Sequence, residues 1–313
     1  MRVLVTGANG FVGRAAVRRL AEDGGFSLAI LTRNPGAWNG PGEALDVAAD
    51  IDAPAADFGN ALVGVDAILH LAARSAGRDE AVLQRANRQY TAQLARAAAA
   101  AGVRRFVFVS SIKVNGESTA KTPFTAADIP APQDAYGRSK RDAENDLRAI
   151  ASETGLEIVI VRPPLVMGPG VKGNLRAMAK AVAKGLPLPV GAFTDNRRDL
   201  VGLSDLADLL AVVLRHERAA GRVFVTKSGS ALSTVGLVQA LGAALGRKPR
   251  LVNVPQAILR AATGIAGLGA AFDRLAGNLE VDDTETRRLL DWTPPAGLDV
   301  EFARFAEGLK AAD

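Results

Sequence analysis

The sequence predicts an α/β protein: a doubly wound parallel sheet with a smaller, mostly helical C-terminal domain. Short apolar runs alternate with helical segments through the first half of the chain, the pattern of a parallel sheet covered by helices on both faces. A glycine-rich turn follows the first run directly. After Arg162, prolines divide the chain into loops and short helices, and the last third is mostly helical.

Five apolar runs, rich in Val, Ile and Leu, are predicted as buried strands. They cover residues 2–6, 26–31, 66–72, 105–110 and 156–161. The helices predicted between them cover residues 11–23, 79–101 and 136–154. Each crossover between parallel strands is expected to be right-handed.

The composition argues against several classes of function. The chain has no cysteine and only two histidines, so neither a disulfide framework nor a Cys- or His-based metal site is expected. The net charge of +5 is spread along the chain rather than gathered in blocks, which argues against a nucleic-acid partner. The longest charge-free apolar stretch near the C-terminus, residues 261–272, is shorter than the about 20 residues that cross a bilayer. We expect a cytoplasmic protein without a transmembrane segment.

The turn after the first strand has glycines at three spaced positions in the segment TGANGFVG. In a strand–turn–helix unit, such glycines allow a tight turn, a close backbone approach to a pyrophosphate and close helix–sheet packing. The free N–H groups of the following helix would face the phosphates. The alternative is an ordinary strand–helix turn. The residues expected to hold a dinucleotide are Gly7, Asn9, Gly10, Phe11, Val12 and Gly13.

The end of the second strand indicates which dinucleotide is bound. A site for NAD usually places a carboxylate there for the ribose 2′-hydroxyl, but this sequence has Arg33. A guanidinium would pair with a 2′-phosphate, so NADP is preferred and NAD remains the alternative. Arg33 could also be a surface residue at the strand end. Asp46 and the adjacent Val47 are expected near the adenine, although Asp46 is also a good turn residue.

Two domains follow from this assignment. Residues 1–165 form a dinucleotide-binding Rossmann domain, and a segment at about 195–226, with a further helix and strand, returns to it. Residues 166–194 and 227–313 form the substrate-binding domain.

Tyr136 and Lys140 lie four residues apart on a predicted helix, so their side chains share one face. A free phenol has a pKa near 10, which is too high for a base at neutral pH. An ammonium about 4 Å away contributes on the order of 4 kcal/mol, so Lys140 is expected to lower the pKa of Tyr136. Tyr136 would then exchange a proton with a substrate hydroxyl or ketone, and Ser111 would hydrogen-bond the same oxygen. A purely structural Tyr–Lys pair is the alternative.

Four segments together resemble the extended short-chain dehydrogenase/reductase family, of the nucleotide-sugar epimerase and reductase kind. They are TGANGFVG, SSIKVNG, YGRSK and RPPLVMGPG. The resemblance covers nearly the whole chain. It implies a homodimer in which helices 79–101 and 136–154 pair with their copies as a four-helix interface.

The resemblance also implies roles for single residues. Ser111, Tyr136 and Lys140 match the catalytic triad of the family. The residues that match its remaining cofactor contacts are Leu71, Ala72, Ala73 and Pro163. The expected substrate contacts are Ser111, Lys113, Asn174 and Arg198, and Arg198 matches the arginine that pairs with a substrate diphosphate. A UDP-sugar or a related diphosphate sugar, which includes a polyprenyl-diphosphate sugar, is the expected partner.

The residues after Ser111 narrow the reaction. Sugar dehydratases of that family carry an Asp–Glu pair there, because elimination of water needs an acid and a base. This sequence has Ile112 and Lys113, so plain hydride chemistry at C4 of a sugar remains. Because a reductase consumes and releases its cofactor, Arg33 favours an NADPH-dependent 4-ketoreductase. The segments SSIKVNGE and DNRRDLV resemble the subgroup of that family that is involved in surface-polysaccharide sugars. A UDP-hexose or UDP-N-acetylhexosamine 4-epimerase with bound NAD, and a non-catalytic NADP-binding sensor, stay open.

Overall fold

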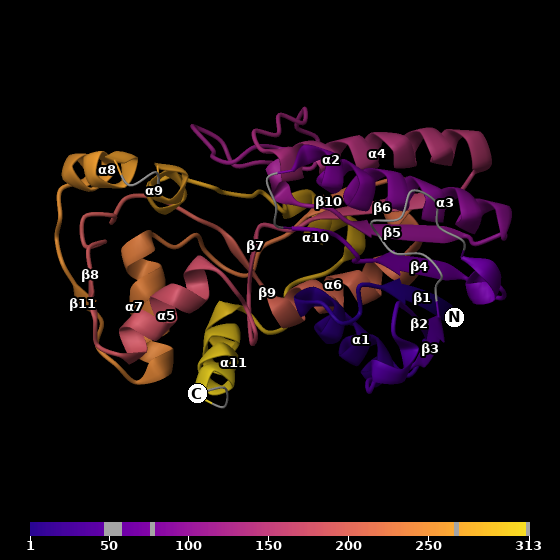
Figure 1. Ribbon diagram of the computed structural model, residues 1–313, viewed down its shortest axis with the longest axis horizontal. Coiled ribbons are helices and arrows are strands. Elements are labelled where there is room, and N and C mark those ends of the chain that lie inside the picture. Colours follow the sequence, from indigo (N-terminus) through magenta and orange to yellow (C-terminus); the bar gives the residue numbers. More distant parts are fainter. Residues whose placement is uncertain (47–57, 76–78, 266–268, 311–313) are drawn as a thin grey trace.

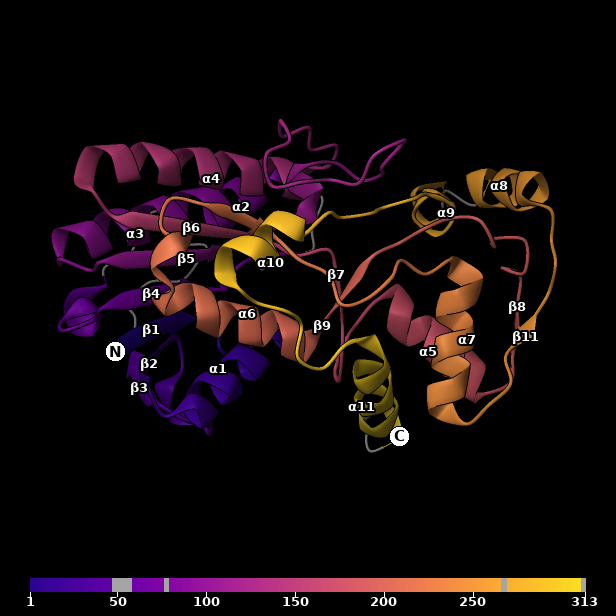
Figure 2. The same ribbon diagram turned by 180° about the vertical axis from the view of Figure 1, so that it is seen from behind.

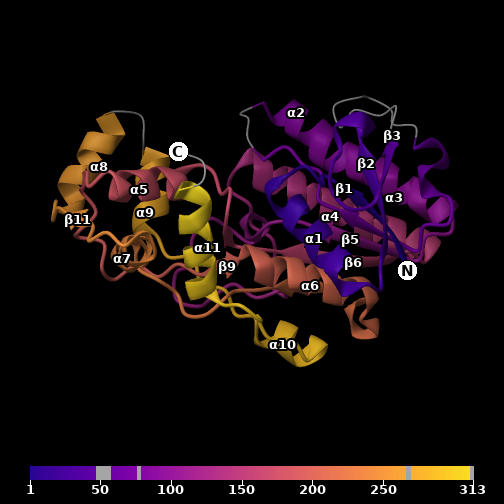
Figure 3. The ribbon, with the colours of Figure 1, turned by 90° about the horizontal axis from the view of Figure 1, so that it is seen from below.

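The computed structural model describes residues 1–46, 58–75, 79–265 and 269–310. It has two parts side by side: a large parallel sheet covered by helices on both faces, and a smaller, mostly helical part that holds α5, α7, α8 and α9 (Figure 1). Helix α11 lies between the two parts when the molecule is seen from below (Figure 3). The predicted fold class is confirmed.

The large sheet has seven strands in the order β10-β6-β5-β4-β1-β2-β3, all paired in parallel. Its strands are β1 (Arg2–Thr6), β2 (Ser27–Thr32), β3 (Glu43–Asp46), β4 (Ala67–His70), β5 (Arg105–Val109), β6 (Glu157–Arg162) and β10 (Val223–Val225). Two further pairs of short strands are β7 (Leu165–Met167) with β9 (Leu200–Gly202), and β8 (Pro187–Leu188) with β11 (Arg250–Leu251).

The helices near the large sheet are α1 (Phe11–Asp23), α2 (Glu80–Leu83), α3 (Tyr90–Ala100), α4 (Ala135–Thr154), α6 (Leu203–Arg215) and α10 (Thr284–Leu290). Those of the smaller part are α5 (Asn174–Ala183), α7 (Thr234–Leu245), α8 (Gln256–Ile265) and α9 (Gly269–Ala276), and α11 (Leu298–Lys310) lies beside them. A π-helical turn, Gln84–Gln89, joins α2 to α3 inside the segment predicted as one helix. In the described ranges, no helix is both long enough and apolar enough to cross a membrane.

Alternation along the strands divides the core of the large sheet into two layers. Val3 and Val5 of β1 point to one face and pack with apolar residues of α1 and α6. Leu4, between them, points to the other face and packs with residues of α3 and α4. The sheet is therefore buried on both sides, as its nearly continuous apolar strands predict.

The long helix α4 has well-defined ends, which fix the position of Tyr136 in its first turn. The Asp134 carboxylate caps the helix by accepting a hydrogen bond from the Gly137 N–H at 2.6 Å. At the other end, Gly155 adopts a φ of 76°, a left-handed conformation that glycine accepts without strain. The outward faces of α3 and α4 carry charged pairs such as Arg96–Glu153. The homodimer expected through these two helices stays a prediction.

The smaller part has its own apolar cluster, which includes Phe193 and Phe272 with their rings edge to face at 5.7 Å. The last third of the chain does not stay in this part. Leu289 and Leu290 of α10, with Trp292, pack in the core between the large sheet and α6, and Figure 2 shows α10 over that sheet. The division into two domains remains a prediction. The segment of α10 and Trp292, which the sequence assigns to the substrate-binding domain, lies at the large sheet.

Candidate active site

A pocket of about 270 Å³ lies where β1, β2 and β4 end. Carboxyl ends of parallel strands are the usual place for ligands in this kind of sheet. The pocket is lined by Thr6, Gly7, Ala8, Asn9, Gly10, Leu31, Thr32, Arg33, Leu71, Ala72, Ala73 and Tyr90. Three loops that are distant in the sequence therefore meet around one cavity.

Gly7 in the first loop and Gly13 in the first turn of α1 occupy positions that a larger residue could not. Gly7 has a φ of +71°, and a Cβ added to it would lie 2.6 Å from the Ala72 nitrogen. A Cβ on Gly13 would lie 2.1 Å from the Gly7 carbonyl oxygen, because the start of α1 lies directly against the turn. The loop is thus built as a bare backbone cradle at a helix N-terminus, which fits a dinucleotide pyrophosphate.

The residues predicted to contact the cofactor lie in the pocket, in the helix turn behind it, or beside Ser111. The pocket is lined by Gly7, Asn9, Gly10, Arg33, Leu71, Ala72 and Ala73 of the predicted set. Phe11, Val12 and Gly13 form the first turn of α1 behind it. The carbonyl of Pro163 accepts a hydrogen bond from the Ile112 N–H at 3.0 Å, next to Ser111. Asp46 ends β3 and its side chain, like all of Val47, lies outside the described residues.

His70 is a buried structural residue at the end of β4. Its Nδ1 lies 2.7 Å from the Thr6 hydroxyl, and its Nε2 lies 2.9 Å from the Thr91 hydroxyl. Thr91 donates to the Asn87 carbonyl, so the His70 Nε2 carries the proton and Nδ1 accepts one from Thr6. The Thr6 oxygen in turn accepts from the Ala72 N–H. Burial, with repulsion from Lys140, lowers the pKa of His70 to about 3, so it is neutral and anchors the loop beside the pocket.

The side chain of Lys140 is buried one turn after Tyr136. Its Nζ donates to the carbonyl oxygen of Val109 at 2.9 Å and lies 4.3 Å from the centre of the Phe108 ring. Burial lowers the pKa of Lys140 to about 7, against the opposing effect of the Glu144 carboxylate. The ammonium is therefore held at the end of β5, directly before Ser110 and Ser111.

The pKa of Tyr136 differs from the expectation. Burial raises it to about 12, and the negative charge of Asp134 acts in the same direction. The prediction of a lowered Tyr136 pKa is thus wrong for the protein alone. Desolvation disfavours the phenolate, while the ammonium, itself desolvated, is held by the Val109 carbonyl. At neutral pH Tyr136 is a phenol that can donate a proton.

A buried ion pair under these residues was not predicted. Arg162 at the end of β6 donates to both oxygens of Glu144, from Nε at 2.9 Å and from one terminal nitrogen at 2.6 Å. Ser110 donates to the same carboxylate at 2.6 Å, and Arg162 also donates to the side-chain oxygen of Asn115. Glu144 and Arg162 are at most 1% exposed. The one feature of the sequence that could have indicated this pair is the arginine at the end of the apolar run EIVIVR.

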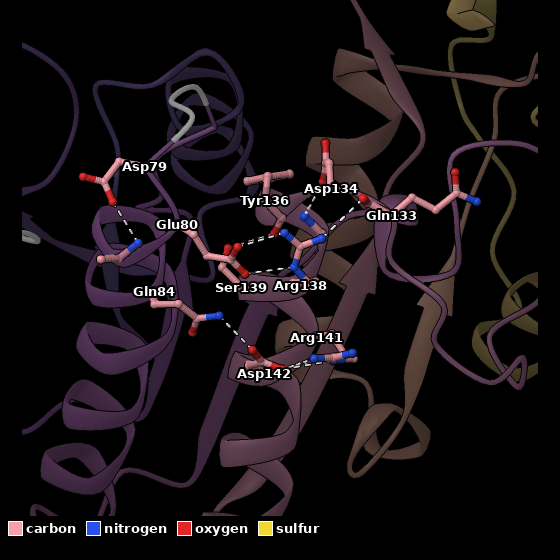
Figure 4. A network of polar contacts seen from close by, with 12 residues as sticks. Asp79, Glu80, Gln84, Gln133, Asp134, Tyr136, Arg138, Ser139, Arg141 and Asp142 are labelled. Atoms are coloured by element: carbon pink, nitrogen blue, oxygen red, sulfur yellow. Dashed lines mark hydrogen bonds and ion pairs between the residues drawn. The ribbon is translucent and has the colours of Figure 1, made fainter. Parts of the chain in front are cut away.

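The outer side of α4 is joined to α2 and to the π-helical turn after it by polar contacts (Figure 4). Arg138 donates twice to the Glu80 carboxylate, each time at 2.9 Å, and Gln84 donates to Asp142 at 2.8 Å. Deeper in the same interface, buried Asn87 donates to the hydroxyl of Ser139 at 3.0 Å. The helix that carries Tyr136 and Lys140 is therefore held against the sheet on one side and against α2 on the other.

The residues expected to bind substrate are spread over the junction of the two parts. Lys113 is paired with the carboxylates of Glu117 and Asp134, which neutralise its charge. Asn174 is exposed at the first position of α5 and lines neither of the two pockets described here. Arg198 is half-buried and donates to the Gly277 carbonyl at 3.0 Å.

Arg198 stands beside a second pocket of about 660 Å³, which the Gly277 carbonyl borders. The pocket is lined by Glu117, Ser118, Gln133, Gln256, Ala257, Arg260, Phe272, Asp273, Arg274, Ala276 and Gly277. Burial lowers the pKa of the Arg198 guanidinium, and the positive charge of Arg274 lowers it further, while Glu117 opposes both. Over the described ranges, neither arginine forms an ion pair with a carboxylate.

The carboxylates near Arg198 in the sequence have other partners. Asp199 pairs with Lys227 at 3.2 Å and accepts from the Val281 N–H at 2.7 Å. Asp205 accepts from the hydroxyl of Ser228. Arg198 therefore does not brace its loop by pairing with Asp199 or Asp205.

Comparison with known proteins agrees with this arrangement. The NAD dependent epimerase/dehydratase family matches residues 3–225. A UDP-glucose 4-epimerase from Vibrio cholerae is 36% identical over 99% of this chain and 96% of the relative. A probable dTDP-4,6-dihydroxy-2-methyloxan-3-one 4-ketoreductase from Streptomyces antibioticus is 31% identical over 74% of this chain and 73% of the relative.

Solved structures share the fold over the full length. The UDP-glucuronic acid 4-epimerase from Bacillus cereus, in complex with UDP-glucuronic acid and NAD, superposes with a TM-score of 0.80 at 20% identity. That match covers 100% of both chains. Together with the family match over most of the sequence, these relatives establish that the chain is a member of the NAD dependent epimerase/dehydratase family, within the extended short-chain dehydrogenases/reductases.

Proposed function

We propose that the protein catalyses NAD(P)-dependent hydride transfer at C4 of a nucleotide-linked sugar, with Ser111, Tyr136 and Lys140 as catalytic residues. The observation that carries the substrate class is the pair Arg198 and Arg274 beside the second pocket. The charge of Arg274 lowers the pKa of Arg198, so the two guanidiniums disfavour each other in the protein alone. A diphosphate between them would remove this repulsion and could accept parallel hydrogen bonds from the planar fork of Arg198.

The catalytic residues have protonation states that suit the reduction of a ketone. A bound nicotinamide dinucleotide supplies or accepts the hydride. Tyr136 is protonated at neutral pH and can donate its proton to the C4 oxygen. Lys140, with a pKa of about 7, can change its charge near neutrality, which allows it to compensate a developing phenolate. Ser111 follows β5 and would hydrogen-bond the same substrate oxygen.

Two reactions use this chemistry, and different observations favour each. The relative that matches nearly the full chain at 36% identity is a 4-epimerase, whereas the 4-ketoreductase matches at 31% over 74% of the chain. Arg33, which lines the cofactor pocket, favours NADP and hence a ketoreductase. Because the epimerase relative matches over both parts of the chain, we place 4-epimerisation first and ketoreduction second.

The test is a product assay with purified protein. Incubation of UDP-glucose and UDP-N-acetylglucosamine with NAD is expected to yield the C4 epimer without net reduction of the cofactor. Net consumption of NADPH with a 4-keto sugar nucleotide would instead establish the ketoreductase. If neither reaction occurs with nucleotide sugars, the same assays on a polyprenyl-diphosphate sugar test the second carrier. Tight NADP binding without turnover of any of these substrates would contradict the proposal and favour a sensor.

A further inference from the structure

Helix α8 presents its apolar stripe to the solvent. Surface helices usually turn such a stripe toward the core, with apolar residues three and four positions apart. In α8 this spacing is met by Ile258, Ala261, Ala262 and Ile265, and all four are exposed. Ile258 is 60% exposed and Ile265 is 90% exposed. None of the helix residues is buried, so the stripe has no partner among the described residues.

The other two sides of α8 are already occupied. Leu259 packs against the apolar cluster of the smaller part. Gln256, Ala257 and Arg260 line the second pocket, and Arg260 lies 6.0 Å from the centre of the Phe272 ring. The stripe is therefore not exposed because the helix fails to pack against the rest of the protein. It is a third, outward face of a helix whose inner sides serve the core and the pocket.

Further exposed apolar residues gather at the same end of the molecule. Figure 1 shows α8, β8 and β11 together at the end opposite the large sheet. Val252 follows β11 and is 43% exposed, and Leu186 precedes β8 and is 50% exposed. The Val252 N–H donates to the Leu188 carbonyl at 2.8 Å, which joins the two segments. Half of the eight large apolar residues that are exposed in the described ranges lie at this end.

The segment that contains α7, β11 and α8 carries positive charge without negative charge, while Glu117 and Asp273 from other segments line the second pocket beside α8. Between Arg218 and Phe272 the sequence contains no Asp or Glu. Arg247 and Lys248 lie in the turn before β11, Arg250 begins that strand, and all three are exposed; Arg260 is on α8. No ion pair involves these four in the parts of the chain that the structure describes.

We propose that the stripe of α8 docks on an anionic lipid bilayer. A short amphipathic helix binds the interface by burying its apolar face among the headgroups, and nearby basic residues add attraction to acidic lipids. A second copy of this chain is the less suitable occupant, because a symmetric contact would bring the basic residues of both copies together. Docking would hold the second pocket beside the headgroups, since α8 lines both surfaces.

Vesicle co-sedimentation tests the proposal without any substrate, so its outcome is independent of the proposed reaction. The full chain is mixed with vesicles of phosphatidylcholine alone or of phosphatidylcholine with phosphatidylglycerol. We expect binding to the anionic vesicles only, and a decrease with added salt because charge attraction is screened. The double variant Ile258→Ser with Ile265→Ser is expected to lower the partition coefficient by about tenfold or more, given the apolar surface removed.

Matched variants separate the stripe from general hydrophobicity and charge. Val63→Ser with Ile129→Ser removes two exposed apolar side chains elsewhere, 68% and 88% exposed, and is expected to keep wild-type binding. Arg247→Gln with Lys248→Gln and Arg250→Gln should weaken binding to anionic vesicles. Melting temperature and cofactor affinity, measured on each variant, show that the fold is retained. The proposal is overturned if the wild-type protein does not sediment with anionic vesicles, or if the stripe variant binds them as strongly as the wild type. A wild-type dimer in light scattering that the stripe variant loses would assign the surface to a second copy instead.

Discussion

Replacing Glu144 with glutamine tests whether the buried ion pair beneath the site positions the proposed catalytic residues. The amide has nearly the same shape, but it removes the negative charge that faces the Arg162 guanidinium, which is 1% exposed. Breaking a buried pair by removing one partner costs about 3–5 kcal/mol, because the other charge stays buried without compensation. The folding equilibrium constant of Glu144→Gln should therefore fall roughly a hundredfold or more.

The same substitution acts on Lys140. The Glu144 carboxylate raises the pKa of Lys140 against the lowering effect of burial, which leaves it at about 7. Without this carboxylate the pKa of Lys140 should fall below 7. Any limb of the pH–rate profile that reports Lys140 should then move to lower pH.

Urea denaturation followed by circular dichroism gives the change in unfolding free energy. Glu153→Gln is the matched control, because Glu153 lies on the same helix and pairs with Arg96 at an exposed position. Exposed pairs contribute little, so this variant should remain near the wild type. If Glu144→Gln is as stable as Glu153→Gln and its pH profile is unchanged, the ion pair does not have the role inferred from its burial.

Three further substitutions test single features of the site. Gly13→Ala should weaken cofactor binding and lower the melting temperature, because its Cβ would lie 2.1 Å from the Gly7 oxygen; Gly264→Ala, with open space around it, is the control for both measurements. Arg33→Asp should reduce affinity for NADPH relative to NADH, since a carboxylate repels a 2′-phosphate; equal affinities of the wild type for both cofactors would argue against the NADP preference. Arg198→Lys should raise KM for a diphosphate sugar and leave cofactor affinity unchanged; a lowered melting temperature with an unchanged KM would make Arg198 a structural residue.

The elements and the glycine-rich turn could be predicted because their signals are local. The apolar runs became β1, β2, β4, β5 and β6, and the helix predicted at residues 11–23 has those bounds in the structure. The spacing of Gly7, Gly10 and Gly13 describes contacts within one turn, and the Gly7 and Gly13 backbones have the close neighbours that such spacing requires. Local sequence is sufficient where the contacts themselves are local.

Features that depend on contacts across the fold could not be predicted. The sign of the Tyr136 pKa shift depends on burial, which sequence spacing does not report. The pairing of Glu144 with Arg162 joins α4 to the end of β6, and Arg274 reaches the site of Arg198 from a distant helix. The return of α10 to the large sheet has the same origin, since its few apolar residues do not indicate which core they join.

The central claim is hydride transfer at C4, and isotope labelling tests it most directly. UDP-glucose deuterated at C4 is incubated with wild-type protein and NAD, and the product is examined by NMR, with Tyr136→Phe as the variant that lacks the phenol hydroxyl. We predict a primary isotope effect, deuterium at C4 of the epimer, and a loss of turnover in Tyr136→Phe of about 10²- to 10⁴-fold. Turnover at a carbon other than C4, or full activity of Tyr136→Phe, would contradict the claim.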